Sequence, residues 1–488
     1  MKIKFILSLL VVTFLFGCED SFLEIPSETS LSKPVYFKTQ DDLEQAINGA
    51  YAPLRNLYSG SNGAYAMGEL RSDNTTYKYN PNDRGTIQPE YIADFLVQSS
   101  NDVLINKYSN DYSIIARVNQ IFDLIDGVDF DESAKNNIKG QAYFLRAFAY
   151  FDLVQYFGEV PLHLKAATTL DETALPLSSV EDIYNQIISD ASQAVDLLPD
   201  KATQEKGRVT SGSAKTLLGN VYIVQEKWSD AETVLKNVTG YSLLSNYSDV
   251  FDPALKNNSE SVFEIQYKQG TEGFASNFFY TFLVQPISAE EISAVTGIAE
   301  IARTIEGYNI PTPDIINTYE PNDLRKDASI GYITASGVGY PYIKKYAHDH
   351  ELTNNTDDDW PVYRYSEVLL FIAEALNEQN KTTEALTYLN QVRTRAGLDN
   401  SPASGQSEIR EAIRKERRVE LAFENKRWLD LVRTNQAEQV MTAYGSRIKA
   451  DPQAYYFPSG ITVSPSAYTN IELLFPIPAS EASLNPYF

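Results

Sequence analysis

Apolar residues recur at helical spacing over much of this chain. Residues 41–57 show the pattern well, because they open with Asp41 and Asp42 and then place Leu43, Ile47 and Leu54 on one face. The same periodicity predicts further helices over residues 112–125, 134–157, 180–198 and 407–433. A largely α-helical fold follows from this pattern.

Two predicted helix pairs have the same internal spacing. Gly219 and Ala231 lie twelve positions apart in the first pair, and Ala373 and Ala385 do so in the second. Small residues at this spacing let two antiparallel helices approach closely, as in tetratricopeptide repeats. The pairs are separated by 373 − 219 = 154 positions, so the repeats do not form a continuous array along the chain, and we expect a stack of paired helices. Two unrelated amphipathic hairpins are the alternative.

The helical pattern is lost between the two pairs. Residues 261–267 alternate between apolar and polar side chains, which predicts a strand, and turns rich in Gly, Asn and Ser surround them. A second short strand is predicted over residues 471–475, and the polar stretch 59–90 is predicted to be loop. The predicted fold class is mainly α, with a tetratricopeptide-like helix-hairpin body and an irregular, aromatic-rich insertion that contains a few short strands.

The N-terminal residues have the pattern of an export signal. Lys2 and Lys4 precede an apolar run over residues 5–16, which is too short to span a bilayer core of about 30 Å. The run ends at Cys18, the only cysteine of the chain, in the arrangement of a bacterial lipoprotein signal. We therefore predict a signal peptide over residues 1–17 and lipidation of Cys18. An ordinary secreted protein with a free thiol is the alternative.

Three regions are predicted after the signal peptide. Residues 18–240 form an N-terminal region with the first helix pairs, and residues 241–362 form a loop-rich insertion that faces the ligand. Residues 363–488 form a C-terminal region with the second hairpin and the charged helix.

The composition restricts the class of partner. The chain has 41 Lys and Arg against 65 Asp and Glu, a net charge of −24, which repels phosphate backbones and argues against nucleic-acid binding. It also has 32 Tyr and 23 Phe. Tyrosine combines a flat apolar face with a polar tip, which suits wet binding surfaces.

Recognisable catalytic motifs do not occur in the sequence. No His-Glu-x-x-His zinc motif is present, and we expect His348 and His350 to lie in an exposed polar loop. Glu69 stands where a phosphate-binding loop needs lysine. Asp357, Asp358 and Asp359 lack the spaced ligands of a known calcium loop, so a solvated turn is expected. No cofactor is predicted; calcium is possible but unsupported. A glycosidase needs only two carboxylates, placed in space, so this alternative stays open.

Several motifs, taken in order along the chain, resemble the SusD/RagB family of outer-membrane lipoproteins. They are Cys18-Glu19-Asp20, Gln141-Ala142-x-x-Leu145-Arg146-Ala147, Tyr156-Phe157-Gly158-x-Val160-Pro161, Phe263-Glu264-Ile265-Gln266-Tyr267, Asn322-Asp323-Leu324-Arg325, Tyr363-Arg364-Tyr365-Ser366-Glu367, Arg393-x-Arg395-Ala396-Gly397-Leu398, the run from Glu416 to Glu424, and Leu474-Phe475-Pro476. In the run from Glu416 to Glu424, we expect Glu and Arg side chains to pair across the surface of a helix, each pair contributing about 0.2–0.5 kcal/mol.

The resemblance implies a function as well as a fold. Members of this family bind a nutrient outside the cell, usually an oligosaccharide and sometimes a peptide. They deliver it to a SusC-type TonB-dependent transporter in the outer membrane and catalyse no reaction. We therefore expect a lipid-anchored glycan-binding protein on the outer face of the outer membrane. Peptide capture by the same fold is the alternative, and a surface glycosidase is a weaker one.

Two predicted loop clusters supply the side chains that sugar binding needs. Aromatic faces pack on pyranose rings, and Asp and Asn bond to the hydroxyl groups. The candidate ligand-binding residues are Asp73, Asn74, Tyr77, Tyr79, Tyr91, Phe278 and Tyr280. A further aromatic set, from which ligand contacts are also possible, is Tyr332, Tyr340, Tyr342 and Trp360. The alternative for each residue is a loop that its own aromatic side chains pack onto the body.

Overall fold

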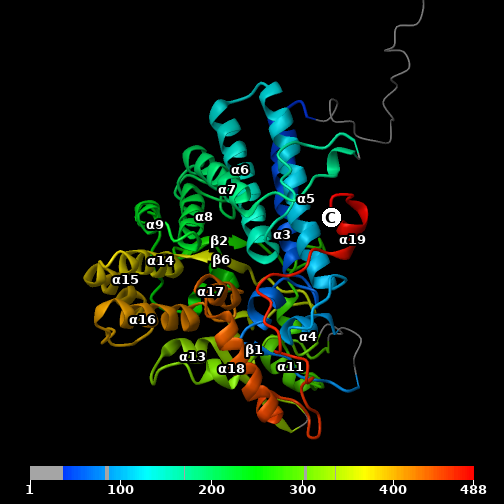
Figure 1. Cartoon of the computed structure of the whole chain (residues 1–488), viewed down its shortest axis with the longest axis vertical. Helices are drawn as coiled ribbons and strands as arrows, with labels where there is room; N and C mark the ends of the chain where they lie inside the picture. The colour runs from blue at the N-terminus through cyan, green and yellow to red at the C-terminus, as the bar shows by residue number, and fades with distance from the viewer. Residues whose placement is uncertain (1–36, 83–86, 170, 302–304, 336) are drawn as a thin grey trace, which may run out of the picture.

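Helices are the main regular element of the described residues, as the hydrophobic periodicity predicts (Figure 1). The computed structural model describes residues 37–82, 87–169, 171–301, 305–335 and 337–488. The predicted signal peptide and Cys18 lie outside these residues. Within them, no helix combines the length and the apolar character that a membrane span requires.

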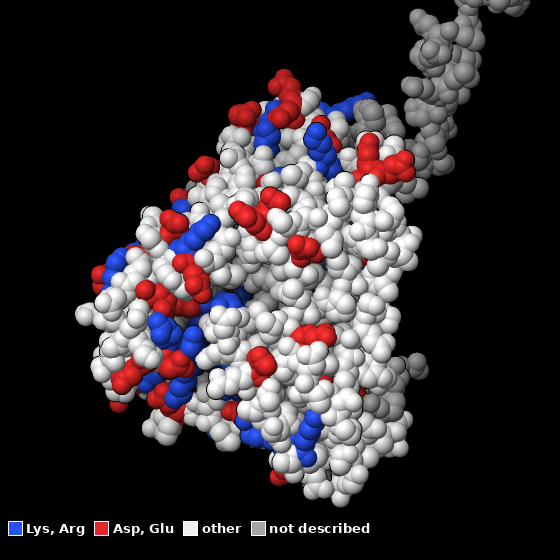
Figure 2. All heavy atoms as spheres, viewed as in Figure 1, with Lys and Arg blue, Asp and Glu red and all other residues white. Residues whose placement is uncertain are grey.

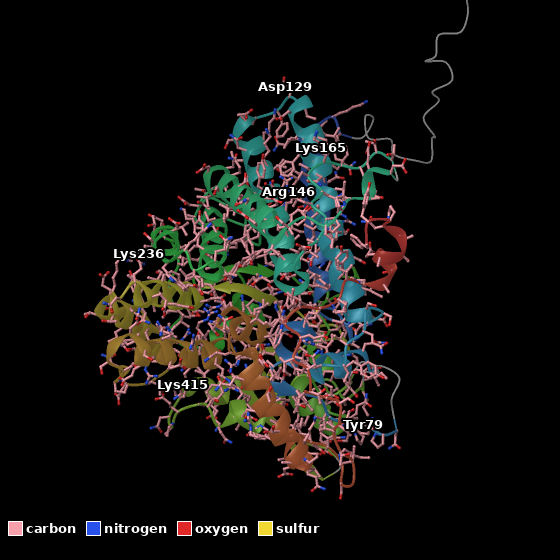
Figure 3. The ribbon with its side chains drawn as sticks, in the orientation of Figure 1. Tyr79, Asp129, Arg146, Lys165, Lys236 and Lys415 are labelled. Atoms are coloured by element: carbon pink, nitrogen blue, oxygen red, sulfur yellow. The ribbon has the colours of Figure 1, made fainter. Side chains whose placement is uncertain are left out.

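Four long helices form the N-terminal part of the body. They are α3 (Gln40–Leu57), α5 (Asp102–Leu124), α6 (Glu132–Phe157) and α7 (Val180–Leu197). Each begins at a side chain that accepts a backbone N–H bond, as Thr39 does for α3 and Ser179 for α7. Inside this bundle Arg146 of α6 binds Asp190 of α7 through two hydrogen bonds of 2.7 and 2.8 Å (Figure 3). The helices predicted over residues 41–57, 112–125, 134–157 and 180–198 are confirmed.

The two predicted hairpins stack on each other in space. The first is α8 (Ser211–Val224) with α9 (Trp228–Leu235), and the second is α14 (Tyr365–Glu378) with α15 (Thr382–Arg395). Helix α9 packs against α14, and α7 packs against α8, so α6 to α9, α14, α15 and α16 (Gly405–Glu420) follow one another as a single array (Figure 1). The expected stack of paired helices is therefore confirmed, although the two pairs lie far apart in the chain.

Glycine at the first helix crossing is needed for the close approach. A Cβ atom on Gly219 would lie 2.4 Å from Leu235 Cδ2, a fully buried side chain. The equivalent positions of the second hairpin, Ala373 and Ala385, are also fully buried. The twelve-residue spacing of small side chains thus marks the helix contact in both hairpins.

Shorter elements connect and cover the array. The remaining helices are α4 (Gln88–Ala93), α10 (Phe278–Thr281), α11 (Ala289–Thr296), α12 (Pro313–Ile316), α13 (Leu324–Ser329), α17 (Arg427–Arg433), α18 (Ala437–Ala450) and α19 (Ala479–Leu484). The strands are β1 (Thr75–Thr76), β2 (Ser261–Ile265), β3 (Ile310–Pro311), β4 (Ile330–Ala335), β5 (Val338–Ile343) and β6 (Trp360–Arg364).

The strands form three antiparallel two-stranded ladders: β1 pairs with β3, β2 with β6, and β4 with β5. The strand predicted over residues 261–267 is present as β2. All five of its residues are buried, so its polar side chains do not face solvent as the alternation predicts. The boundaries proposed at residues 240 and 362 remain a prediction.

Three local expectations were wrong. The charged helix predicted over residues 407–433 divides into α16 and α17, because Phe423 and Asn425 adopt left-handed backbone conformations with φ of 70° and 63°. Residues 471–475 form no strand; instead Phe475 N–H donates to Tyr156 C=O at 2.8 Å. The polar stretch 59–90 is largely buried between residues 63 and 77 and contains a π-helical turn, Ala66–Leu70.

A network of buried charges joins segments that are far apart in the chain. Arg364 at the end of β6 binds Glu260 and Glu420, each at 2.9 Å, and Glu424 at 2.7 Å. Arg325 of α13 binds Glu416 at 2.6 Å and Glu420 at 3.1 Å. The members of this buried ion network are Glu260, Asp323, Arg325, Lys345, Arg364, Arg393, Arg395, Glu416, Glu420 and Glu424.

The network overturns the surface-pair interpretation of the Glu416–Glu424 run. Glu416, Glu420 and Glu424 are all nearly inaccessible to solvent, and their partners come from other elements. Burial alone would raise the pKa of Glu420, but the Arg395 and Arg364 guanidinium groups hold it well below its usual range. The side chains of this run therefore form buried ion pairs with other elements and do not lie on a solvated helix face.

We expect Glu420→Ala to reduce the free energy of unfolding by about 3–5 kcal/mol, because three buried guanidinium groups lose their shared carboxylate. Urea unfolding followed by circular dichroism measures this change. Glu411→Ala is the matched control on the same helix, since Glu411 makes an exposed pair with Arg414, and it should change stability by less than about 1 kcal/mol. Equal effects of the two substitutions would contradict a structural role for the network.

Candidate functional site

Asp73 and Asn74 are buried and pair with other parts of the chain. Asp73 binds Arg427 and Arg418, both at 2.8 Å, and Asn74 binds Glu69 at 3.0 Å. Both side chains are less than 5% exposed. They are polar residues of a buried connection, so neither presents its side chain to a ligand in this structure.

Tyr77, Phe278 and Tyr280 are also buried. The Tyr77 hydroxyl donates to Asp94 at 2.9 Å, and the Tyr280 hydroxyl lies 2.6 Å from His350 Nε2. The Phe278 ring is enclosed by other aromatic rings, including Trp360 at 5.1 Å. None of the three leaves a ring face for a sugar, because the loops pack onto the body through these side chains. For these three residues the structure shows the alternative given above, in which aromatic side chains pack a loop onto the body.

Glu69 connects this N-terminal segment to the turn between α16 and α17. Its carboxylate accepts the backbone N–H groups of Phe423 at 3.0 Å and Asn425 at 3.1 Å. Burial raises the pKa of Glu69 to about 7, while the hydrogen bonds from Asn74 and Phe423 favour its charged form. Glu69, which stands where a phosphate-binding loop would need lysine, is thus part of the same structural connection as Asp73.

Four half-buried or exposed tyrosines lie together where three chain segments meet. Tyr79 follows β1, Tyr332 and Tyr340 belong to the β4–β5 hairpin, and Tyr456 precedes Phe457. The ring of Tyr79 stacks on Phe457 with a centroid distance of 6.0 Å, and the Tyr340 and Tyr456 rings are 5.9 Å apart. We call Tyr79, Tyr332, Tyr340 and Tyr456 the tyrosine surface.

Backbone pairing holds these segments in place. β1 pairs with β3, Lys78 N–H donates to Gly307 C=O at 2.9 Å, and the Tyr456 hydroxyl donates to Pro311 C=O at 2.8 Å. Tyr332 stands out from the hairpin with 65% of its surface exposed. The result is a fixed set of ring faces with one ring that projects into solvent.

The tyrosine surface carries little net charge. Burial raises the pKa of Tyr340 and of Tyr456, so both hydroxyls are neutral at pH 7 and donate or accept hydrogen bonds. Lys78 lies 5.6 Å from the Tyr340 ring centre and donates to Gln285 C=O at 2.5 Å. Tyr79 lies at the lower right of the molecule (Figure 3), where few charged side chains appear in Figure 2. Such a surface suits a neutral polar ligand with flat apolar faces.

The structure thus separates the predicted candidates. Tyr79 belongs to the tyrosine surface, and Tyr91 on α4 keeps 38% of its surface exposed. Of the further aromatic set, Tyr332 and Tyr340 join the surface, whereas Tyr342 and Trp360 are buried. Sequence reasoning missed Tyr456, although the consecutive aromatic residues Tyr455, Tyr456 and Phe457 precede a turn at Pro458-Ser459-Gly460 and were a usable signal.

The acidic and histidine residues considered for metal binding have other partners. Asp357 accepts from Gln269 N–H at 2.8 Å, Asp359 from Tyr267 N–H at 2.7 Å, and Asp358 pairs with His348 at 2.5 Å. The aspartate run is therefore not a solvated turn, and His348 and His350 are half-buried and not fully exposed. Among the described residues, no three His, Cys, Asp or Glu side chains group as metal ligands would.

The stacked helix pairs define a helical-repeat protein, and comparison with known families identifies its group. A model described as the SusD family matches residues 317–487, and one described as starch-binding associating with outer membrane matches residues 21–223. The chain belongs to the SusD/RagB family. Membership makes it a binding protein and not an enzyme, and the second model's description associates the group with the outer membrane.

Curated relatives cover nearly the whole chain. SusD-like protein P2 of Formosa agariphila is 28% identical over 99% of this chain and 97% of its own length. A SusD-like protein of Bacteroides ovatus is 27% identical over 88% of this chain and 82% of its own length.

Solved structures share the fold at lower identity. A laminarin binding SusD-like protein aligns over 92% of this chain and 98% of its own, with a TM-score of 0.74 and 24% identity. Surface glycan-binding protein A from Bacteroides thetaiotaomicron in complex with laminarihexaose aligns over the same shares, with a TM-score of 0.74 and 21% identity. A SusD-like carbohydrate binding protein from Bacteroides fragilis aligns over 93% and 99%, with a TM-score of 0.76 and 22% identity.

We expect Asp73→Asn to reduce the free energy of unfolding at pH 7, and we expect this reduction to be smaller at acidic pH. Burial alone would raise the pKa of Asp73, but Arg427 and Arg418 lower it to about 2 in the folded protein, below the unfolded value of about 4. The carboxylate therefore contributes about 2 kcal/mol above pH 4, and the contribution is lost as the pH falls from 4 to 2.

Urea unfolding of the wild-type protein and of Asp73→Asn at pH 7 and pH 3 measures the difference in their free energy of unfolding. Asp126→Asn is the control, since Asp126 pairs with Lys139 at the surface, and its effect should stay below about 1 kcal/mol at both pH values. A cost for Asp73→Asn that is unchanged between pH 7 and pH 3 would contradict the electrostatic explanation.

Proposed function

We propose that this protein binds an oligosaccharide outside the cell through the tyrosine surface. The observation that carries the proposal is the meeting of Tyr79, Tyr340 and Tyr456 on a fixed frame, with Tyr332 projecting beside them. Ring faces that are already in position pack on pyranose rings with little loss of side-chain entropy. The hydroxyl groups add hydrogen bonds to the sugar without introducing charge.

The relatives support a carbohydrate ligand. Two of the structures with this fold are a laminarin binding protein and a surface glycan-binding protein solved with laminarihexaose. Tyr79 and Tyr91 remain candidate contacts from the sequence, and we add Tyr332, Tyr340 and Tyr456. Asp73, Asn74 and Tyr77 support the frame behind the surface, whereas Phe278 and Tyr280 are packed in the core.

We further propose that the bound glycan passes to a SusC-type TonB-dependent transporter. The protein would stay beside the transporter through acyl chains on Cys18, on the outer face of the outer membrane. The family match and the apolar run that ends at Cys18 support this placement.

We expect Tyr332→Ala and Tyr340→Ala each to weaken binding of a neutral β-linked glucose hexamer at least tenfold, because each removes an aromatic face from the surface. Isothermal titration calorimetry with the mature protein measures the affinity. Tyr487→Ala is the matched control, since Tyr487 is 61% exposed outside the tyrosine surface, and it should bind normally.

The same samples distinguish binding from catalysis. Chromatography of the hexamer after long incubation should show it intact, whereas steady release of shorter sugars would favour a glycosidase. Unchanged affinity in Tyr332→Ala, Tyr340→Ala and Tyr79→Ala together would remove the tyrosine surface as the binding site.

We expect Cys18→Ala to abolish lipidation and to release the protein from the membrane fraction. Metabolic labelling with a fatty-acid analogue should mark the wild-type protein and not the variant. Ser21→Ala is the control for altered residues near the processing site and should stay labelled. Persistent labelling of Cys18→Ala would show that another residue carries the acyl group.

A further inference from the structure

A cavity lies between α3 and β2, away from the tyrosine surface. Its volume is about 570 Å³, and α3, the loop 205–208, the end of β2 and Phe274 line it. The charged residues of the lining are Arg55, Glu205, Lys206, Arg208 and Glu264, and the aromatic residue Phe274 lies beside Arg55. The cavity is large enough for one or two sugar rings.

Arg55 and Phe274 form one wall of this cavity. The Arg55 guanidinium lies 4.8 Å from the centre of the Phe274 ring, and Phe274 is still 46% exposed. Within the part of the chain that the structure describes, the Arg55 guanidinium has no carboxylate or hydrogen-bond acceptor. An arginine held against an aromatic ring with its N–H donors free is a ready partner for an anionic group.

Cations gather near Arg55 in a chain of net charge −24. Lys206 and Arg208 add two more cations to the lining. Glu264 is nearly buried and accepts from Asn257 N–H at 2.6 Å, while the largely exposed Glu205 pairs with Arg208 at 3.1 Å. Arg208 also lies 3.9 Å from Glu44, so its charge is shared by two carboxylates, whereas the Arg55 guanidinium keeps its donors free among the described residues.

We propose that this cavity binds an acidic sugar, with its carboxylate or sulfate group on Arg55 and its ring against the exposed part of Phe274. Arg208 and Lys206 would strengthen the attraction at the edge of the cavity. Because the molecule as a whole repels polyanions, retention of an acidic glycan requires a local cationic site of this kind. The site is separate from the tyrosine surface and does not depend on it.

Affinity measurements with three matched probes test the proposal: an oligogalacturonate, a sulfated oligogalactose and the uncharged oligogalactose. We expect at least one acidic probe to bind the wild-type protein, and Arg55→Gln and Phe274→Ala each to weaken it at least tenfold. Arg414→Gln removes the same charge from a remote, half-buried position on α16 and should leave binding unchanged.

The outcomes are distinct from those for the tyrosine surface. Arg55→Gln should keep the neutral glucose hexamer bound, and Tyr332→Ala should keep the acidic probe bound. Binding of only one acidic probe supports the proposal and identifies carboxylate or sulfate as the preferred group. Failure of both acidic probes, equal binding of the uncharged probe, or equal losses in Arg55→Gln and Arg414→Gln would overturn it. Unchanged unfolding midpoints establish that the variants are folded.

Discussion

The arrangement of the whole molecule depends on a charge-balanced set of buried ion pairs. Glu420 accepts from Arg325, Arg364 and Arg395, which come from a short helix, a strand end and the second helix hairpin. Removing such groups from water costs several kcal/mol for each ion, so every member must find its partners. This requirement disfavours any arrangement that leaves one of these ions without a partner. The hydrophobic faces of the stacked helices provide the burial, and the ion pairs connect segments that are far apart in the chain.

A second buried connection holds the frame of the tyrosine surface. Asp73 binds Arg418 and Arg427, and Glu69 accepts two backbone N–H groups from the turn after α16. These contacts fix the start of β1, and β1 in turn pairs with β3 beside Tyr456. Side chains that looked suitable for sugar hydroxyls therefore position the rings that remain open. A site on a rigid frame binds with a smaller entropy loss.

Much of the fold was predictable from the sequence, and the reason is physical. Helical periodicity reports which face of a segment is apolar, and the spacing of Gly219 and Ala231 reports the close crossing of two helices. Neither signal reports which helices are neighbours, so the stack was predicted but the contact of α9 with α14 was not. The charge run from Glu416 was assigned to the surface because pattern alone cannot distinguish a solvated ion pair from a buried one.

The candidate site was less predictable because tyrosine serves two purposes in this chain. The Tyr77 hydroxyl is bonded to Asp94 and its ring is enclosed, whereas the Tyr456 hydroxyl is bonded to Pro311 while its ring stays partly open. A tyrosine whose hydroxyl is hydrogen-bonded can therefore have either an enclosed or an open ring. Only the packing on the ring face distinguishes the two cases. Composition shows that many tyrosines are available. Which of them can meet a ligand is determined by segments such as 452–460, which lie far away in the chain and close in space. The ring faces that are open to a ligand therefore follow from tertiary packing and not from the loop in which each tyrosine occurs.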